Sequence, residues 1–248
     1  MYFFAVLLSF AMASCNPPKE NRTFNVGGVE FTMVYVEGGT FMMGSDDASD
    51  DEKPVHQVTL SDYYIGQTEV TEDLWFAVMD SIPSDSVPSF YERENLPVIE
   101  VSWYDCQEFI GKLNRITGEN FCLPTEAQWE FAARGGIYSK GYKYSGSNAI
   151  DKVAWYWKNS VLMIHPVGTK QANELGIYDM SGNVEEWCGD WYGNYSYVAV
   201  TDPSGPSSGS HRVFRGGAWY NSATSCTCRN GGTPTGAHNG LGLRLALK

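Results

Sequence analysis

The stretch that decides the fold is residues 176–187, GIYDMSGNVEEW. It places two acidic side chains, Asp179 and Glu186, seven positions apart on either side of a Gly-Asn turn at 182–183. The turn offers free backbone carbonyls, and Ca²⁺ takes six to eight oxygen ligands at about 2.3–2.6 Å. These residues predict a calcium loop. The competing interpretation is that Asp179 caps a turn and Glu186 pairs with an arginine.

A helix is predicted before this loop, within residues 123–136, LPTEAQWEFAARGG. Thr125 and Gln128 have the spacing of a capping box, and Gly135 follows the last helical residues. Two further helices are predicted over residues 71–79, from a Thr cap, and over residues 102–116, from Ser102. The second has a core-facing apolar stripe at helical spacing, formed by Cys106, Phe109, Ile110 and Leu113.

The N-terminal part of the domain predicts strands. Residues 29–36 alternate as a strand does, Gly38 and Gly39 interrupt them, and residues 41–43 resume the pattern, which predicts a hairpin. The acidic stretch 46–52 lacks the alternating carbonyl or Gly positions of a cation loop and is interpreted as a solvated loop. After residue 136 the pattern is one of turns and short strands with interspersed tryptophans. We expect side chains and ions to order that part.

Composition favours one loop-rich domain. The chain has 248 residues, 43% of them hydrophobic and only 19% charged, with no internal repeat or linker between about residue 27 and its end. The formal net charge of −12 argues against a phosphate backbone as partner, because nucleic-acid binding rests on clustered Lys and Arg. We therefore expect no nucleic-acid ligand.

Residues 1–14 are interpreted as a signal peptide, because the apolar run 3–12 has the length of an h-region and is too short to span a bilayer. One cleavage site follows Ala13. The favoured alternative is a bacterial lipoprotein signal with Cys15 as the lipidated residue, residues 15–26 as the tether and residues 27–248 as the domain. This predicts an exported protein held at a membrane by its lipid. A third interpretation is a buried first strand.

The remaining five cysteines are an odd number, so in an oxidising compartment at least one is unpaired within the chain. Their spacing contains no CxxC pair, and the four histidines are far apart in sequence. Neither pattern is typical of a zinc site, and the histidines are interpreted as structural.

Several blocks resemble the formylglycine-generating-enzyme (sulfatase-modifying factor) family, in the family's order. They cover about nine-tenths of the chain, and they are residues 38–45, 54–56, 68–71, 97–103, 123–136, 176–187, 215–219 and 242–244. The resemblance implies an α+β, C-type-lectin-like fold that is loop-rich, with few short helices and small sheets. It also implies a calcium loop built from the carboxylates of Asp179 and Glu186 and the carbonyls of Gly182 and Val184.

The oxidase motif is incomplete. Active members of the family carry Trp-x-Cys-x4-Cys after the Arg-Gly-Gly block, and the two thiolates bind copper(I), a soft ion suited to sulfur. Here Trp219 is followed by Asn221 at the first thiol position and by Cys226 at the second. Cys228 is a weak substitute, because side chains two apart on an extended strand are roughly 6–7 Å apart. The alternative for Cys226 is a disulfide, with Cys188 as the leading partner.

The C-terminal stretch 220–240 mixes aromatic, hydroxyl and amide residues, as antibody binding loops do. It resembles the variable region of lectin-fold proteins diversified by retroelements, but an ordinary Gly- and Ser-rich loop has the same bias. The candidate binding rim consists of Tyr220, Asn221, Ser222, Thr224, Asn230, Thr235, His238 and Asn239.

The sequence supports two alternative functions. The first is a surface-displayed module for a protein or glycan ligand, stabilised by calcium, because a rigid lectin-like fold presents its loops for binding. The second is a copper-dependent oxidase that converts a sulfatase cysteine to formylglycine, with Cys226 as the catalytic thiol. The sequence feature that separates them is Asn221.

Overall fold

The computed structural model describes residues 20–83, 94–222 and 224–247. The predicted leader and Cys15, the predicted site of lipidation, lie outside the described residues. No helix in the described ranges is both long enough and apolar enough to span a bilayer.

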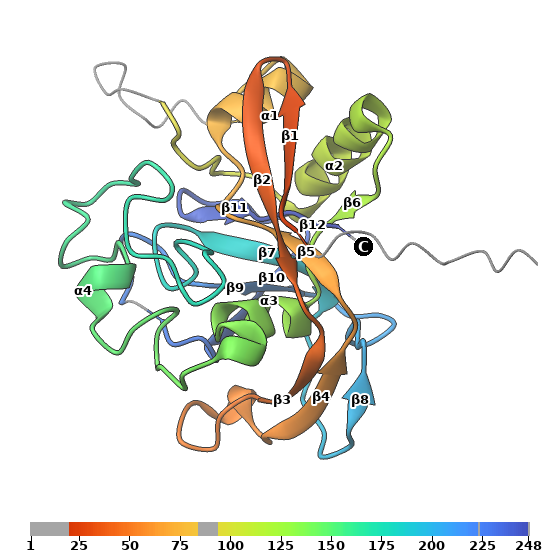
Figure 1. Ribbon diagram of the computed structural model, residues 1–248, viewed down its shortest axis with the longest axis vertical. Coiled ribbons are helices and arrows are strands. Elements are labelled where there is room, and N and C mark those ends of the chain that lie inside the picture. Colours follow the sequence, from red (N-terminus) through yellow and green to blue (C-terminus); the bar gives the residue numbers. More distant parts are fainter. Residues whose placement is uncertain (1–19, 84–93, 223, 248) are drawn as a thin grey trace, which may run out of the picture.

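Strands predominate toward both ends of the described chain, and the α-helices lie between them in sequence (Figure 1). The helices and single turns of 3-10 helix (η) are α1 Glu72–Met79, α2 Trp103–Thr117, α3 Glu126–Ala133, α4 Ile150–Val153, η1 Asp50–Glu52 and η2 Gly136–Tyr138. The strands are β1 Arg22–Val26, β2 Val29–Val36, β3 Gly39–Met43, β4 His56–Leu60, β5 Tyr63–Gly66, β6 Phe121–Cys122, β7 Glu185–Trp191, β8 Val200–Thr201, β9 Arg212–Arg215, β10 Arg229–Gly232, β11 Leu241–Leu243 and β12 Ala246–Leu247.

Three sheets organise these strands. Their orders are β1-β2-β5-β12-β6, β10-β9-β7-β11 and β3-β4-β8. The first sheet joins the two ends of the domain, because β12 pairs with both β5 and β6. In the second, β11 runs parallel to β7, directly after the predicted calcium loop. The mixture of small sheets and few helices is the α+β architecture expected from the sequence.

Two expectations about the N-terminal part are wrong. The predicted hairpin does not form, because β2 pairs with β1 and β5 whereas β3 pairs with β4 in another sheet. Gly38 lies where the chain passes from one sheet to the other, and a side chain would not fit there, since an added Cβ would lie 2.3 Å from the carbonyl oxygen of Leu60. Residues 22–26, assigned to the tether, form β1 in register with β2, so the folded domain begins before residue 27.

The three predicted helices form with the predicted caps. Thr71 accepts a hydrogen bond from Leu74 N, and capping boxes join Ser102 to Asp105 and Thr125 to Gln128. Each cap satisfies backbone N–H groups that a helix start leaves without partners. The one-turn helix α4 was not predicted, because four residues are too few to show a helical period.

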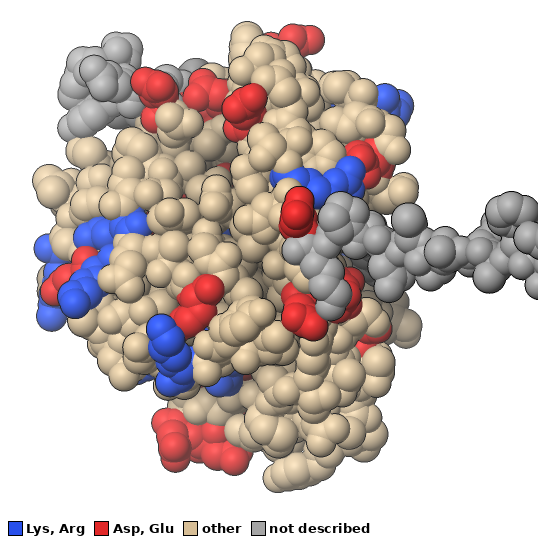
Figure 2. Space-filling view, in the orientation of Figure 1, with Lys and Arg blue, Asp and Glu red and all other residues tan. Residues whose placement is uncertain are grey.

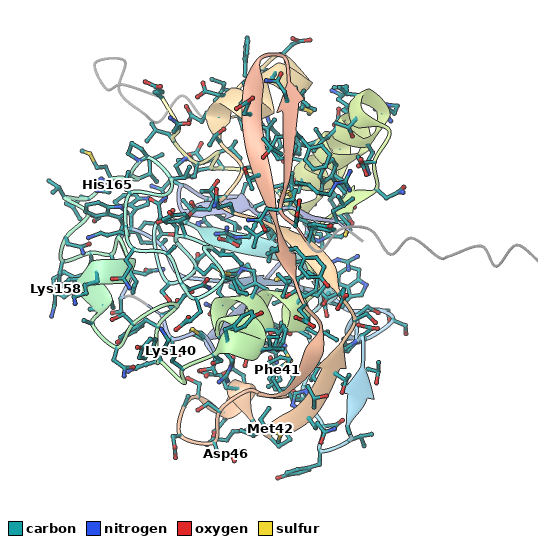
Figure 3. The ribbon with its side chains drawn as sticks, viewed as in Figure 1. Phe41, Met42, Asp46, Lys140, Lys158 and His165 are labelled. Carbon is teal, nitrogen blue, oxygen red and sulfur yellow. The ribbon has the colours of Figure 1, made fainter. Side chains whose placement is uncertain are left out.

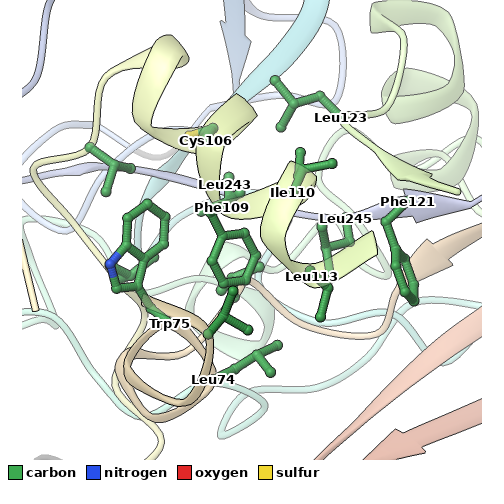
Figure 4. Close-up of a cluster of buried hydrophobic side chains, with 14 of the residues drawn as sticks. Leu74, Trp75, Cys106, Phe109, Ile110, Leu113, Phe121, Leu123, Leu243 and Leu245 are labelled. Carbon is green, nitrogen blue, oxygen red and sulfur yellow. The ribbon is translucent and has the colours of Figure 1, made fainter. Parts of the chain in front are cut away.

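The hydrophobic core has two main parts. In the first, α1 and α2 pack on the largest sheet, and Trp75 stacks on Phe109 with ring centroids 4.8 Å apart (Figure 4). The predicted stripe of α2 is fully buried here. The second part surrounds α3, all of whose residues are buried, including Glu126 and Glu130. Buried carboxylates need partners, and arginines from β9 and β10 supply them.

Candidate functional site

The predicted calcium loop lies between α4 and β7 and contains two left-handed residues, Asp179 (φ 64°) and Asn183 (φ 64°). Gly182 is required by close packing, because an added Cβ would lie 2.3 Å from the carbonyl oxygen of Trp155. The same carbonyl accepts a 2.8 Å hydrogen bond from Asn183 N. These contacts fix the turn, so that the side chains of Asp179 and Glu186 are both buried.

Asp179 has one carboxylate oxygen without a partner. Its Oδ2 accepts a 2.7 Å hydrogen bond from Gly168 N, whereas its Oδ1 is buried without a hydrogen-bond partner. Burial raises the pKa of Asp179 to about 6. An orphaned buried carboxylate oxygen is what a cation would satisfy.

Glu186 is already engaged. Its two oxygens accept hydrogen bonds from Arg244 at 2.6 and 2.9 Å, and its Oε2 also accepts one from Trp129 Nε1 at 2.6 Å. The arginine pairing weighed as an alternative in the sequence is therefore present. The ligand set implied by the resemblance fits at Asp179, but Glu186 would have to exchange its bonds to Arg244 for a bond to the cation.

Glu69 is a third buried carboxylate beside this loop, and the sequence analysis did not assign it. Its oxygens accept hydrogen bonds from Asn183 Nδ2 at 3.3 Å and Val184 N at 3.4 Å. Burial raises its pKa well above the ordinary value, and the charges of Asp179 and Glu186 raise it further. Three carboxylates face one guanidinium here, so a proton or a cation must offset the excess charge. Within the described ranges, no group of three or more Cys, His, Asp or Glu side chains has the arrangement of a metal site.

The cysteines are not arranged as a pair. Cys226 is only 2% exposed, its thiol donates to the Ala133 carbonyl at 3.4 Å, and burial raises its pKa to about 12. The expected disulfide with Cys188 is absent, since both residues are free thiols in the core around α3. Cys228 follows Cys226 in a turn closed by a hydrogen bond to Ser225, so the extended strand assumed for residues 226–228 is wrong.

Part of the predicted rim comes together. Tyr220 OH lies 3.0 Å from His238 Nδ1, and Trp219 Nε1 donates to the Asn239 carbonyl at 2.9 Å, which joins residues 219–222 to residues 238–239. Burial lowers the pKa of His238. Asn221, Ser222 and Asn239 are exposed beside this junction.

The other rim residues are placed differently. Thr224 is half-buried and donates to the Gly216 carbonyl, so its hydroxyl serves the backbone. Asn230 is exposed on β10 and Thr235 is exposed in a later turn, and no hydrogen bond between described residues links either one to the Tyr220–His238 pair. Trp157 also lies beside this rim and was not predicted from the sequence: it is 51% exposed, and its backbone N–H donates to the Asn221 carbonyl at 3.1 Å. Its place in a distant loop left nothing in the sequence to link it to the rim.

The fold and these loops define a C-type-lectin-like domain. The family model for the sulfatase-modifying factor enzyme 1-like domain matches residues 21–248, and the chain belongs to this family. Among solved structures, the Treponema denticola variable protein 1 is 34% identical with a TM-score of 0.85, over 94% of this chain and 99% of that one.

Three curated relatives differ in what their names state. The chaperone protein LppX of Paenibacillus barcinonensis is 35% identical, over 78% of this chain and 80% of its own length. The formylglycine-generating enzyme of Streptomyces coelicolor is 27% identical, over 86% of this chain and 88% of its own. The serine/threonine-protein kinase Pkn1 of Chlamydia trachomatis is 32% identical, but the match spans 38% of its length.

Proposed function

We propose that this chain is an exported, lipid-anchored binding module whose C-terminal rim contacts a protein or glycan ligand, and that it lacks oxidase activity. The observation that carries the proposal is that neither of the two positions where active family members have a copper-binding thiol holds an accessible thiol here. Asn221 stands exposed at the first, and Cys226 is buried at the second with its proton held toward Ala133. A copper(I) site open to oxygen and to a substrate thiol needs two accessible sulfurs.

The rim supports the binding role. Tyr220 and Trp157 supply aromatic surface, and the exposed amides and hydroxyls beside them supply adaptable hydrogen bonds. The likeness to a Treponema protein named as variable supports the interpretation of residues 220–240 as a diversified region. Calcium at Asp179, with the carbonyls of Gly182 and Val184, is proposed to stabilise the loop beneath.

The second candidate is the oxidase, favoured by the likeness to formylglycine-generating enzymes. In that case Cys226 would hold copper and Cys228, which is half-buried, would be the second ligand. The turn at residues 225–228 would have to open so that both sulfurs face one ion.

One experiment separates the two. The purified domain is screened against arrays of surface proteins and glycans and, in parallel, is incubated with copper and a sulfatase-type cysteine peptide. The binding module predicts an array ligand that is lost in the triple variant Asn221→Ala, Ser222→Ala, Asn239→Ala. It also predicts retention in the control Thr23→Ala, Gln57→Ala, which changes exposed residues of β1 and β4. Aldehyde formation that Cys226→Ser abolishes would establish the oxidase instead.

A further inference from the structure

A cavity of about 890 Å³ opens beside α3, and none of the proposed rim residues lines it. Three segments form its walls: the loop after β3, the stretch from Arg134 to Asn148, and the turn 225–227. Figure 3 shows the first two, labelled at Asp46 and Lys140, on the same side of the molecule. The volume lies within the range of small-ligand pockets, about 300–1,000 Å³.

The lining is polar. Its hydroxyl and amide groups come from Ser45, Ser49, Tyr142, Asn148, Ser225 and Thr227, whereas its apolar residues are only Gly44, Ala48 and Gly141. An apolar ligand or the apolar side chains of a peptide would find little surface to cover here. A ligand with many hydroxyl groups would find donors and acceptors on every wall, and the Tyr142 ring offers a face for a sugar ring.

The lining also carries positive charge. Arg134 and Lys143 line the cavity with one carboxylate, Asp47, and one thiol, Cys226, whose proton is directed to Ala133. Arg134 is held in place, because it donates to Glu130 at 2.9 Å and to the Gly44 carbonyl at 2.8 Å. Lys143 is exposed, and no ion pair with another described residue neutralises it. Its ammonium group lies 5.4 Å from the centre of the Tyr144 ring, a contact that does not neutralise its charge. That charge is available to a ligand's anion.

The walls are pre-formed. Cys226 N donates to the Lys143 carbonyl at 3.0 Å, which joins the turn 225–227 to the stretch from Arg134 to Asn148. Within that stretch, Lys143 N donates to Asn148 Oδ1 at 2.8 Å. Ser45 N donates to the Glu52 carbonyl at 3.0 Å and closes the loop after β3. A site fixed in this way loses little conformational entropy on binding.

The charge around the cavity is divided between its walls. Residues 140–170 contain five of the nine lysines and a single acidic residue, Asp151, in a chain of net charge −12. Figure 2 shows Lys and Arg side chains on the side of the molecule where α4 lies. The facing wall is acidic, because the loop after β3 carries Asp46 and Asp47. The positive field therefore favours an anionic group on the side of the cavity that Lys143 lines.

We propose that this cavity binds an acidic saccharide, a sugar or short oligosaccharide whose carboxylate pairs with Lys143 while its hydroxyls bond to the polar walls. The site is separate from the rim. It adds a fixed recognition element that does not depend on the variable-looking residues.

The test is calorimetric titration of the domain with digalacturonate, sialyllactose and a glucuronate disaccharide, with digalactose as the neutral counterpart. At least one acidic sugar is expected to bind, the neutral sugar at least tenfold more weakly, and added salt should weaken binding. Lys143→Gln should weaken binding at least tenfold, because the variant loses the charge-assisted hydrogen bond to the ligand's carboxylate. Ser225→Phe, which places a ring in the cavity, should abolish it.

The matched control is Lys158→Gln, an exposed lysine of the same lysine-rich segment that does not line the cavity. The proposal is overturned if no acidic sugar binds, if Lys143→Gln and Lys158→Gln have the same effect, or if a hexaglutamate peptide binds as well as the sugars. Equal melting temperatures of the three variants and the wild type show that they fold.

Discussion

Arg244 and Glu186 form a two-bonded ion pair with no exposed side-chain surface on either residue. Arg244 also donates to the carbonyls of Gly66 and Tyr178, so that one guanidinium joins the end of β5, the predicted calcium loop and the C-terminal strands. A guanidinium suits this position because its donors are arranged in a rigid, planar fork.

Breaking this pair should be costly. Glu186→Gln replaces a carboxylate that accepts three hydrogen bonds with an amide whose nitrogen cannot accept from the buried Arg244 and Trp129 donors, and removing one partner of a buried pair typically costs about 3–5 kcal/mol. Urea unfolding should show a loss of that size. The control is Glu119→Gln, which breaks the partly exposed pair with Arg22 and should cost about 1 kcal/mol or less. Equal losses in the two variants would contradict the role given to Arg244.

Chelation should destabilise the wild type if calcium occupies the loop at Asp179. We expect EDTA to lower the melting temperature and added calcium to restore it, because the cation satisfies the orphaned Asp179 Oδ1. Asp179→Asn should abolish the response. A melting curve that EDTA leaves unchanged would mean that the surplus charge of Glu69 and Asp179 is balanced by protons.

Stability should fall as the pH rises, in part through Asp190. Burial raises its pKa to about 7, and its Oδ2 accepts a hydrogen bond from Glu126 N at the start of α3. The folded state keeps this proton between about pH 4 and 7, whereas the unfolded chain has lost it. Stability is therefore greatest at the acidic end of this window and is lost by up to about 1.4 kcal/mol per pH unit as the pH rises.

Asp190→Asn should remove that part of the slope, since the amide oxygen can still accept from Glu126 N. The measurement is urea unfolding at several pH values between 5 and 8 for the wild type and the variant. The surface variant Glu30→Gln serves as control. The same slope in wild type and Asp190→Asn would show that Asp190 is ionised in the folded protein throughout.

Restoring the first thiol should create a copper(I) site. Asn221→Cys returns the family's spacing to Cys226, and competition with a chromogenic chelator should show a steep gain in copper(I) affinity over the wild type. The gain requires Cys226 to release the Ala133 carbonyl, so Asn221→Cys with Cys226→Ser should lose it. Turnover of a sulfatase peptide is expected in neither the wild type nor the single variant.

Lipidation at Cys15 predicts globomycin-sensitive processing and partition of the mature protein into detergent. Cys15→Ala should abolish both. A soluble mature form that begins at Ser14 would show cleavage at the alternative site.

The sequence by itself determined the family, the α+β fold class and the three main helices. Caps such as Ser102 with Asp105 and stripes such as Phe109 with Leu113 are local patterns, so they can be identified without knowing what the helix packs against. The missing thiol at Asn221 can likewise be identified from the sequence alone, because the position is defined by its distance from Trp219. An arginine partner for Glu186 was foreseen as the alternative to calcium, but not which arginine it would be.

Only the tertiary structure decided what depends on contacts between distant residues. Arg244 lies 58 positions from Glu186, and Glu69 lies 114 from Asn183, so no local pattern places them together. The strand β3 pairs with β4 in another sheet, and Cys226 and Cys188 are both buried as free thiols. Such ion pairs and buried side chains depend on the packing of the whole chain. A buried charge must find a partner and a close contact excludes other arrangements, but the spacing of residues in the sequence does not say which distant residue is the partner.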